Sequence, residues 1–395
     1  MIKLSNIKIG IITFHDAISY GATLQCYGLQ KFLLNNKYEV KIIDYSMSGY
    51  LELRRRNKIK ALNTQLNKVL INPKKYFKII INRANKQIKQ KDGSKQIRDN
   101  KFASFRKKHY ELSETKYKNF TDLNNNCPNY NAFICGSDQI WNPFFCDRDS
   151  NYYLDFAPIE KRIAYAPSFG VTNLPSKFEN EYINKINGIP YLSIREKSGQ
   201  EIIRKLTGRK VPIVIDPSFL LSPKEWMELA KESEINIEKK YILTYFIGDD
   251  IYIQNYIKEV KEDFCDYEII NLVFDYSEFG PCDFIKLISN AEFVFTNSFH
   301  GMSFCINFNI PFGIGKSLKD FSEDSGFTRM QYLLERLGLE NRIISKDNPL
   351  NRNWISMDFY SSNQKLNVWR NYSKNFLLTA ISEVVFGGNN RSQFI

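Results

Sequence analysis

The sequence predicts an α/β protein of two domains, with parallel sheets covered by helices. Short β-branched runs alternate with amphipathic stretches along most of the chain, which is typical of parallel sheets with crossover helices. The length of 395 residues exceeds that of one ordinary domain. With 43% hydrophobic and 14% aromatic residues, the chain has enough apolar side chains for two packed interiors.

The first half is predicted to contain four strands and one early crossover helix. The strands are Ile7–Phe14, Val40–Asp44, Ala132–Cys135 and Arg162–Ala166. Residues 22–35 fit the helix, because Ala22, Cys26, Leu29 and Leu33 form one apolar stripe at helical spacing.

The second half repeats this alternation. Its predicted strands are Ile189–Ile194, Val211–Ile215, Tyr241–Ile247, Ile269–Phe274 and Glu292–Thr296. Its predicted helices are Ile251–Phe264, Asp283–Asn290, Phe327–Leu337 ended by Gly338, and the long amphipathic segment Gln364–Val385. Gly188 and Pro190 suggest a boundary near residue 190. We therefore expect domains over 1–189 and 190–360, with the closing helix at 361–395 packing back on the first domain.

Basic residues are concentrated in one segment. Residues 52–118 hold 21 Lys or Arg against 5 Asp or Glu, a net charge of +16, whereas the rest of the chain carries −4. Helical periodicity over 51–118 predicts a basic helical insertion in the first domain. It is either a solvated helical face or a surface that attracts an anionic membrane, a lipid-diphosphate acceptor or nucleic acid.

Cysteine and histidine usage predicts no metal centre. The seven cysteines include no C-x-x-C pair, and the chain has three histidines. We expect no cofactor beyond a co-substrate, and buried free thiols typical of a reducing compartment. No run approaches the roughly 18 apolar residues of a spanning helix, and the first residues lack a signal-peptide pattern. The expected location is the cytoplasm.

A polar turn follows the predicted strand at residues 292–296. Ser298, His300 and Gly301 lie where a buried strand enters a helix. Free backbone N–H groups and the helix dipole favour phosphate there, and ligands of open α/β sheets bind at the carboxyl ends of strands. His300 can carry a proton near neutral pH. The structural alternative is a histidine satisfied within the turn.

Two further strand ends carry polar residues. Arg195 ends a hydrophobic run and offers a planar fork for carboxylate or phosphate, or else pairs with a neighbouring loop carboxylate. Ser137 and Asp138 follow the run at 132–135, where they bind a ligand or cap a helix, and Trp141 could stack on a sugar.

The opening loop at residues 15–21 has the position of a dinucleotide-binding loop but lacks G-x-G-x-x-G. The P-loop and G-x-S-x-G patterns are also missing from the sequence. A Rossmann cofactor, a P-loop nucleotide and a serine hydrolase are therefore disfavoured.

Five motifs in order resemble the polysaccharide pyruvyl transferase family. They are GIITFHDAISYGATLQCYGLQKFL, ICGSDQIWN, YLSIRE, IDPSFLL and FTNSFHG, and the resemblance covers nearly the whole chain except most of the basic segment. It implies a GT-B-like fold with two Rossmann-like domains facing across a cleft. It also implies phosphoenolpyruvate as pyruvyl donor and a saccharide acceptor in cell-surface polysaccharide biosynthesis, of exopolysaccharide or capsule type.

The resemblance also assigns donor-side residues. His300 matches the family's cleft histidine, and Arg195 matches an arginine that contacts the donor. Ser298 stands where some members carry an arginine, so Arg329 or Lys316 is expected to compensate. Gly301 and the following helix N-terminus would add backbone donors.

On the acceptor side, Asp138 would act as base toward the incoming hydroxyl or bind it. Trp141 would stack on the sugar ring, and Tyr20, Gly21 and Gln25 would line the same cleft from the opening loop.

Two other function classes remain open. One is a glycosyltransferase of the same architecture that uses a nucleotide sugar, because a diphosphate suits the same helix N-terminus. The other is a non-enzymatic protein that binds nucleic acid or a membrane surface through the basic segment. This segment lacks a nucleic-acid recognition motif, so we favour a peripheral membrane role that serves a lipid-linked acceptor.

Overall fold

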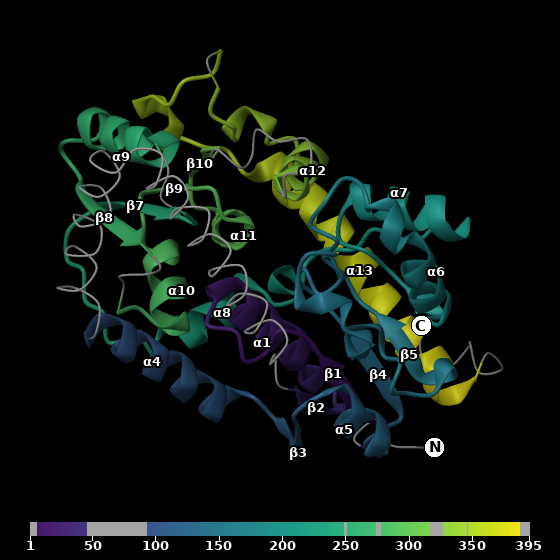
Figure 1. Ribbon diagram of the computed structural model, residues 1–395. Coiled ribbons are helices and arrows are strands. Elements are labelled where there is room, and N and C mark those ends of the chain that lie inside the picture. The colour runs from purple at the N-terminus through teal and green to yellow at the C-terminus, as the bar shows by residue number, and fades with distance from the viewer. Residues whose placement is uncertain are drawn as a thin grey trace, which may run out of the picture.

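The computed structural model describes residues 6–45, 93–248, 251–273, 278–316, 327–345 and 347–387. Two parallel sheets lie side by side, with helices between and around them (Figure 1). Most of the predicted basic insertion, residues 51–92, lies outside the described residues.

The first sheet has six parallel strands in the order β3-β2-β1-β4-β5-β6. These are β1 (Lys8–Ile12), β2 (Glu39–Tyr45), β3 (Leu112–Tyr117), β4 (Ala132–Cys135), β5 (Arg162–Ala164) and β6 (Tyr191–Leu192). The chain reverses its direction of strand addition between β1 and β4, and ligands of open α/β sheets bind at such switch points.

The second sheet has four parallel strands in the order β10-β9-β7-β8. These are β7 (Tyr241–Phe246), β8 (Glu268–Val273), β9 (Phe293–Thr296) and β10 (Phe312–Ile314). Its switch point lies between β7 and β9. Strands β7 and β9 are buried along their whole length, as expected for a sheet covered on both faces.

Helices cover both sheets and fill the space between them. They are α1 (Tyr20–Asn35), α4 (Gly93–His109), α5 (Phe120–Asn125), α6 (Glu179–Asn187), α7 (Lys197–Thr207), α8 (Pro223–Ala230), α9 (Ile251–Asp263), α10 (Pro281–Ser289), α11 (Phe299–Phe308), α12 (Thr328–Leu337) and α13 (Tyr360–Phe386). Gly338 ends α12 in a left-handed conformation, φ 76°, as the sequence predicts.

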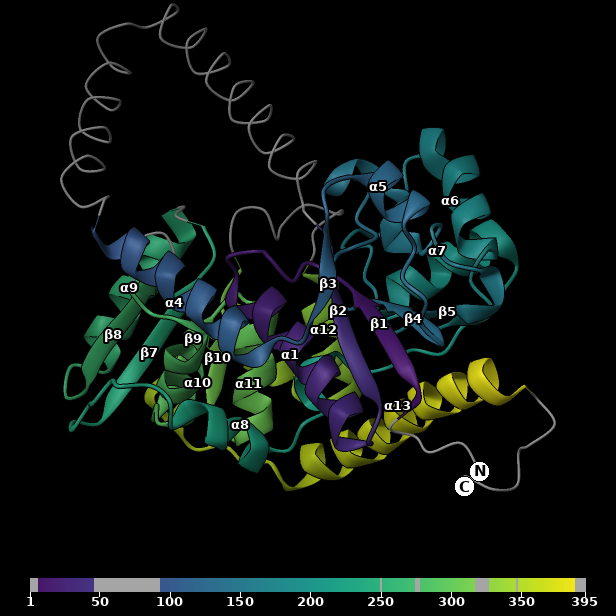
Figure 2. The same ribbon diagram turned by 90° about the horizontal axis from the view of Figure 1, so that it is seen from below.

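The two halves share one core across α1. Tyr20 stacks on Phe284 of α10 with ring centroids 4.4 Å apart, and its hydroxyl donates to the carbonyl oxygen of Phe279 at 2.8 Å. Helix α1 also contacts α11, and Figure 2 shows it between the two sheets. One continuous cluster of buried side chains therefore includes residues from both halves.

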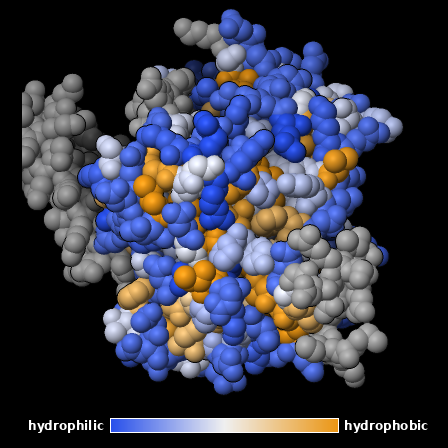
Figure 3. Space-filling model, turned by 90° about the vertical axis from the view of Figure 1, so that its right-hand side faces the viewer, coloured by the Kyte–Doolittle hydropathy of each residue, from blue (hydrophilic) through white to orange (hydrophobic). Residues whose placement is uncertain are grey.

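The closing helix α13 connects the halves on the other side. Its buried positions, among them Leu366, Trp369, Ser373 and Leu377, recur at helical spacing. The helix contacts α12 as well as β4 and β5, and in Figure 2 it lies under the first sheet. On the face shown in Figure 3, hydrophilic residues surround and separate the hydrophobic patches.

The structure corrects three predictions about elements. Residues 112–117 of the predicted helical insertion form β3, an edge strand, since Ser113 and Tyr117 turn inward opposite β2. The predicted strand Val211–Ile215 has only one isolated bridge, between Ile194 and Ile213. The predicted strand Ile189–Ile194 shortens to β6 and pairs with β5 in the first sheet.

The first sheet therefore extends past residue 190, where the sequence suggests a boundary, and the second sheet begins at β7. Strands β3 and β10 and helices α5 to α8 are further elements that the sequence patterns do not single out.

Tyr20 gives a test of the shared core. Replacing Tyr20 by Ala removes a fully buried ring and is expected to lower the free energy of unfolding by about 3–5 kcal/mol. Tyr20→Phe keeps the stacking on Phe284 and leaves the Phe279 carbonyl unpaired, at a cost of about 1–3 kcal/mol. Chemical denaturation measures both. The control is Tyr360→Ala, which removes a side chain that is 70% exposed; equal effects at Tyr20 and Tyr360 would contradict the packing role.

Candidate functional site

Polar residues from both halves meet where the carboxyl ends of the two sheets approach each other. On the side of the first sheet, Asp138 follows β4 and Arg195 follows β6. Asp216 follows the segment 211–215, in which Ile213 forms an isolated parallel bridge with Ile194. In the second half, His300 lies in the first turn of α11, directly after β9. Each side chain follows the carboxyl end of a strand or bridged segment, which is why residues far apart in sequence gather here.

Asp216 is the centre of this cluster. Its side chain is fully buried, and Arg195 Nη1 donates to its Oδ2 at 2.6 Å. His300 Nε2 lies 3.7 Å from the same oxygen, an electrostatic contact longer than a hydrogen bond. Ser137 Oγ lies 3.2 Å from Oδ2, and the Ser218 amide donates to Oδ1 at 2.9 Å. One carboxylate thus joins groups from four segments.

The surroundings keep Asp216 ionised. Burial alone would raise its pKa, but the positive charges of His300 and Arg195 and the Ser218 amide hold the pKa of Asp216 well below its usual range. The carboxylate is therefore an anion at neutral pH.

Arg195 is surrounded by carboxylates. Its side chain is 2% exposed, with Nη2 3.8 Å from Asp138 and Nε 3.9 Å from Glu196. Burial lowers its pKa, but Asp216, Asp138 and Glu196 raise it above the ordinary value. Its guanidinium lies 4.5 Å from the Phe299 ring centroid. Within the described part of the chain, Nε and Nη2 have no hydrogen-bond partner, so two donors remain for a ligand or water.

Arg329, near the start of α12, adds a second guanidinium. It lies 5.7 Å from the Phe299 ring centroid, on the same ring as Arg195. Burial and the nearby charge of Arg195 lower the pKa of Arg329 to about 10, against the opposite effect of Glu196. A cavity of about 10 Å³ next to both arginines has room for about one water.

The local structure of α11 orients His300. Ser298 caps the helix by accepting the Gly301 amide at 3.3 Å, and its own amide donates to Thr296 Oγ1 at 3.0 Å. The imidazole then lies directly against Gly21 of α1. A Cβ added at Gly21 would come within 2.0 Å of His300 Nδ1, so a residue with a side chain would displace the ring.

Three of the predicted donor-binding residues, Ser298, Gly301 and Lys316, make other contacts in the structure. The Gly301 amide is already paired with Ser298, so it is not a spare donor, and Ser298 serves as the helix cap. Lys316 lies after β10 with its ammonium 4.6 Å from the Phe327 ring centroid. Arg329, the other predicted substitute, lies on the same Phe299 ring as Arg195.

Of the predicted acceptor-side residues, three have buried side chains that support the site, and Asp138 is partly accessible to solvent. Tyr20 is buried between the halves, and Trp141 is buried with its Nε1 donating to the Tyr152 carbonyl at 3.0 Å, so neither ring can stack on a sugar. Gln25 is also buried and accepts the Ser137 amide through Oε1 at 3.1 Å. Asp138, with φ 66° and a side chain 14% exposed, borders Arg195.

Sequence reasoning did not assign a role to Asp216 or Glu196. Asp216 follows the β-branched run Val211–Ile215 and precedes Pro217, so it has the same strand-end position as Asp138 and Arg195. Glu196 accepts from Ser168 Oγ and the Phe169 amide, both at 3.0 Å. The polar residue after each predicted strand is the signal that could have found Asp216.

The chain was compared with known proteins. Residues 20–314 match the family model described as polysaccharide pyruvyl transferase, which confirms the resemblance found in the sequence. A search of curated proteins found no match. Across the described residues, every helix is too short or too polar to cross a membrane.

Two solved structures share the architecture. A UDP-N-acetylglucosamine 2-epimerase structure from Listeria monocytogenes is 11% identical with a TM-score of 0.51, over 100% of both chains. Arabidopsis thaliana UGT89C1, complexed with UDP-L-rhamnose, is 9% identical with a TM-score of 0.50, over 98% of this chain and 100% of that one. These similarities concern the fold alone and confirm the GT-B-like arrangement of two Rossmann-like halves.

Asp216 can be tested through stability. Replacing Asp216 by Asn leaves the Arg195 charge buried without its closest partner, so the free energy of unfolding is expected to fall by about 3–5 kcal/mol at neutral pH. Because the folded pKa of Asp216 is depressed, the difference from wild type should be constant above about pH 4 and shrink as the pH falls further.

Denaturation of both proteins across this pH range measures the difference. The matched control is Asp266→Asn, which breaks a pair with Arg352 whose two side chains are about half exposed, and which should change stability little. Similar losses at Asp216 and Asp266 would contradict the central role of Asp216.

Proposed function

Because this chain belongs to the polysaccharide pyruvyl transferase family, we propose that it transfers the pyruvyl group of phosphoenolpyruvate to two hydroxyls of a saccharide, forming a cyclic ketal. The observation that carries the proposal is the contact of His300 and Arg195 with the buried Asp216 anion. This arrangement supplies a proton-transfer group and fixed positive charge in one place, which are the two requirements of this reaction.

The chemistry proceeds through an electrophilic carbon. A proton added to the methylene carbon of the donor makes C2 electrophilic, and the first sugar hydroxyl attacks C2 and loses its proton. Phosphate then leaves, the second hydroxyl attacks C2, and the ring closes. The two sugar hydroxyls together release two protons. One of them replaces the proton that was delivered to the methylene carbon, and the other leaves with the phosphate.

In this proposal His300 delivers the proton. The Asp216 carboxylate lies 3.7 Å from Nε2 of the imidazole and helps to hold the ring in place. Gly21 is a positioning residue, since its missing side chain leaves room for the imidazole.

Arg195 and Arg329 would stabilise the anionic donor and the leaving phosphate. The cavity beside these arginines has room for about one water, so we place the donor on the solvent side of the cluster. His300 is 11% exposed and Asp138 is 14% exposed in their side chains on that side. Asp138 then accepts a proton from the incoming hydroxyl or binds it.

The proposal predicts phosphate release that requires both phosphoenolpyruvate and a saccharide acceptor. Loss of a positioned acid–base group typically costs about 10² to 10⁴ in rate, so His300→Ala should lower turnover by that range. Coupled phosphate detection with candidate saccharides measures the rate, and mass spectrometry detects the ketal. Turnover with a nucleotide sugar in place of phosphoenolpyruvate would instead favour a glycosyltransferase.

A second variant tests the position of the imidazole without removing it. Gly21→Ala should lower turnover because the new Cβ overlaps His300. Gly93→Ala is the matched control, since a Cβ there meets no atom within 4 Å. Circular dichroism and thermal melting establish that each variant is folded.

A folded His300→Ala protein with near wild-type turnover would remove His300 from the mechanism.

We further propose that the saccharide is lipid-linked and that the basic segment draws the enzyme to an anionic membrane surface, in exopolysaccharide or capsule synthesis. The net charge of +16 over residues 52–118 supports this, as do the exposed lysines of α4, among them Lys95 and Lys107.

Liposome flotation tests the membrane proposal. Vesicles containing phosphatidylglycerol should recover more protein than neutral phosphatidylcholine vesicles, and added salt should reduce recovery through charge screening. Equal recovery from the two kinds of vesicle would overturn it.

A further inference from the structure

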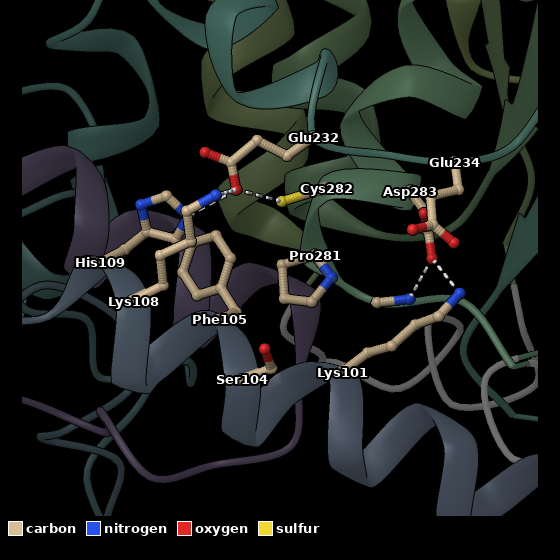
Figure 4. A pocket seen from close by; sticks show the side chains of 11 residues that line it. Lys101, Ser104, Phe105, Lys108, His109, Glu232, Glu234, Pro281, Cys282 and Asp283 are labelled. Carbon is tan, nitrogen blue, oxygen red and sulfur yellow. Dashed lines mark hydrogen bonds and ion pairs between the residues drawn. The ribbon is translucent and has the colours of Figure 1, made fainter.

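A second cluster of chemically reactive side chains lies away from Asp216, beside a cavity of about 370 Å³ between α4 and the second half. Figure 4 shows its lining. The cluster consists of His109 at the end of α4, Glu232 after α8, and Cys282 in the first turn of α10. An imidazole nitrogen, a carboxylate oxygen and a thiol sulfur thus come from three separate segments.

These three ligand atoms converge. His109 Nε2 lies 2.9 Å from Glu232 Oε2, Cys282 Sγ lies 3.9 Å from the same oxygen, and all three atoms lie within 4.8 Å of one another (Figure 4). Ligand atoms around a tetrahedral zinc ion are roughly 3.3 to 3.6 Å apart, given bonds of about 2.0 to 2.3 Å. The observed separations bracket that range, so small side-chain rotations would bring the three atoms to coordination distance.

We propose that His109, Glu232 and Cys282 bind one zinc ion at this cavity, with water in the fourth position. Nitrogen, oxygen and sulfur are the ligand types that zinc accepts, and a mixed set with a thiolate disfavours magnesium or calcium, which prefer oxygen alone. The proposal is independent of the transfer reaction, because none of its residues contacts Asp216.

The charges of the site permit this coordination. Glu232 also accepts from Lys108 Nζ at 2.9 Å, and this lysine side chain is 62% exposed, so it can turn to solvent when the ion enters. A thiolate and a carboxylate then balance the two positive charges of zinc. Cys282 loses its thiol proton to solvent, and His109 binds through the lone pair of Nε2 with its proton on Nδ1.

Cys282 lies where a thiolate can be stabilised once a cation is present. In the structure as it stands, burial and the neighbouring Glu232 carboxylate raise the pKa of Cys282 to about 12, so the thiol keeps its proton. A bound dication reverses this balance and deprotonates a coordinating thiol. The N-terminus of α10 also favours negative charge at this position.

Packing keeps the histidine in place. The His109 ring lies 4.7 Å from the Phe105 ring centroid and 5.6 Å from that of Tyr27, and the His109 carbonyl accepts from Gln30 at 3.1 Å. The His109 side chain is 13% exposed and that of Glu232 is 30% exposed, so an ion can enter from solvent. Bound zinc would link α4, which lies within the basic segment, to the second half.

Cobalt titration of untagged, chelator-treated full-length protein tests the site. The expected result is one equivalent bound with a sulfur-to-cobalt charge-transfer absorption, which zinc then displaces. Loss of a residue that merely supports a ligand typically costs about 10- to 100-fold in metal affinity. We therefore expect Cys282→Ser, which removes a ligand itself, to weaken binding by more than about 100-fold and to abolish the charge-transfer band.

Cys265→Ser is the matched control, because Cys265 is an exposed free thiol outside the cluster and its loss should leave the titration unchanged. His109→Asn is a second ligand variant in case Cys282→Ser fails to fold, which circular dichroism would show. Zinc should raise the melting temperature of wild type and of Cys265→Ser but not of the ligand variants. Failure of wild type to bind one equivalent, or equal binding by Cys282→Ser and Cys265→Ser, would overturn the proposal.

Discussion

Asp216 is a buried anion between an arginine and a histidine from different parts of the chain, Arg195 beyond the first sheet and His300 at the start of α11. A carboxylate removed from water is costly unless it is paired and hydrogen-bonded, so this residue constrains every segment that reaches it. The electrostatics of one side chain therefore favour the arrangement that assembles the site.

The shared core makes that arrangement stable. Helix α1 belongs to the first sheet by connection, yet Tyr20 packs on α10 of the second half, and α13 returns from the second half to contact β4 and β5. Trp369 of α13 donates to the Ile213 carbonyl, and Ser373 accepts the Ile215 amide, directly before Asp216. Apolar packing thus positions the backbone of Asp216, and the ion pairs then orient the side chains around it.

Some residues of the site carry the reactive groups, whereas others only hold these groups in position. Gln25 holds the Ser137 amide, Ser298 caps α11, and Gly21 leaves room for the His300 ring. None of these needs to touch a substrate to matter, because a displacement of the imidazole by a fraction of an ångström changes proton transfer. Polar motif residues at strand ends are therefore a mixture of reactive groups and local scaffolding.

The sequence alone determined the alternation of strands and helices, because hydrophobic periodicity and cap residues are local properties. The elements that it determined include β4, β7, β9, α9, α12 and α13. It also indicated His300, Arg195 and Asp138, since polar residues after strands reach the ligand-binding edge of a parallel sheet. Only the tertiary structure placed β6 in the first sheet, made Asp216 the centre of the cluster, and buried Trp141 and Tyr20. It alone brought His109, Glu232 and Cys282 together. These outcomes depend on contacts between segments distant in sequence, and no local pattern encodes which partner a side chain will meet.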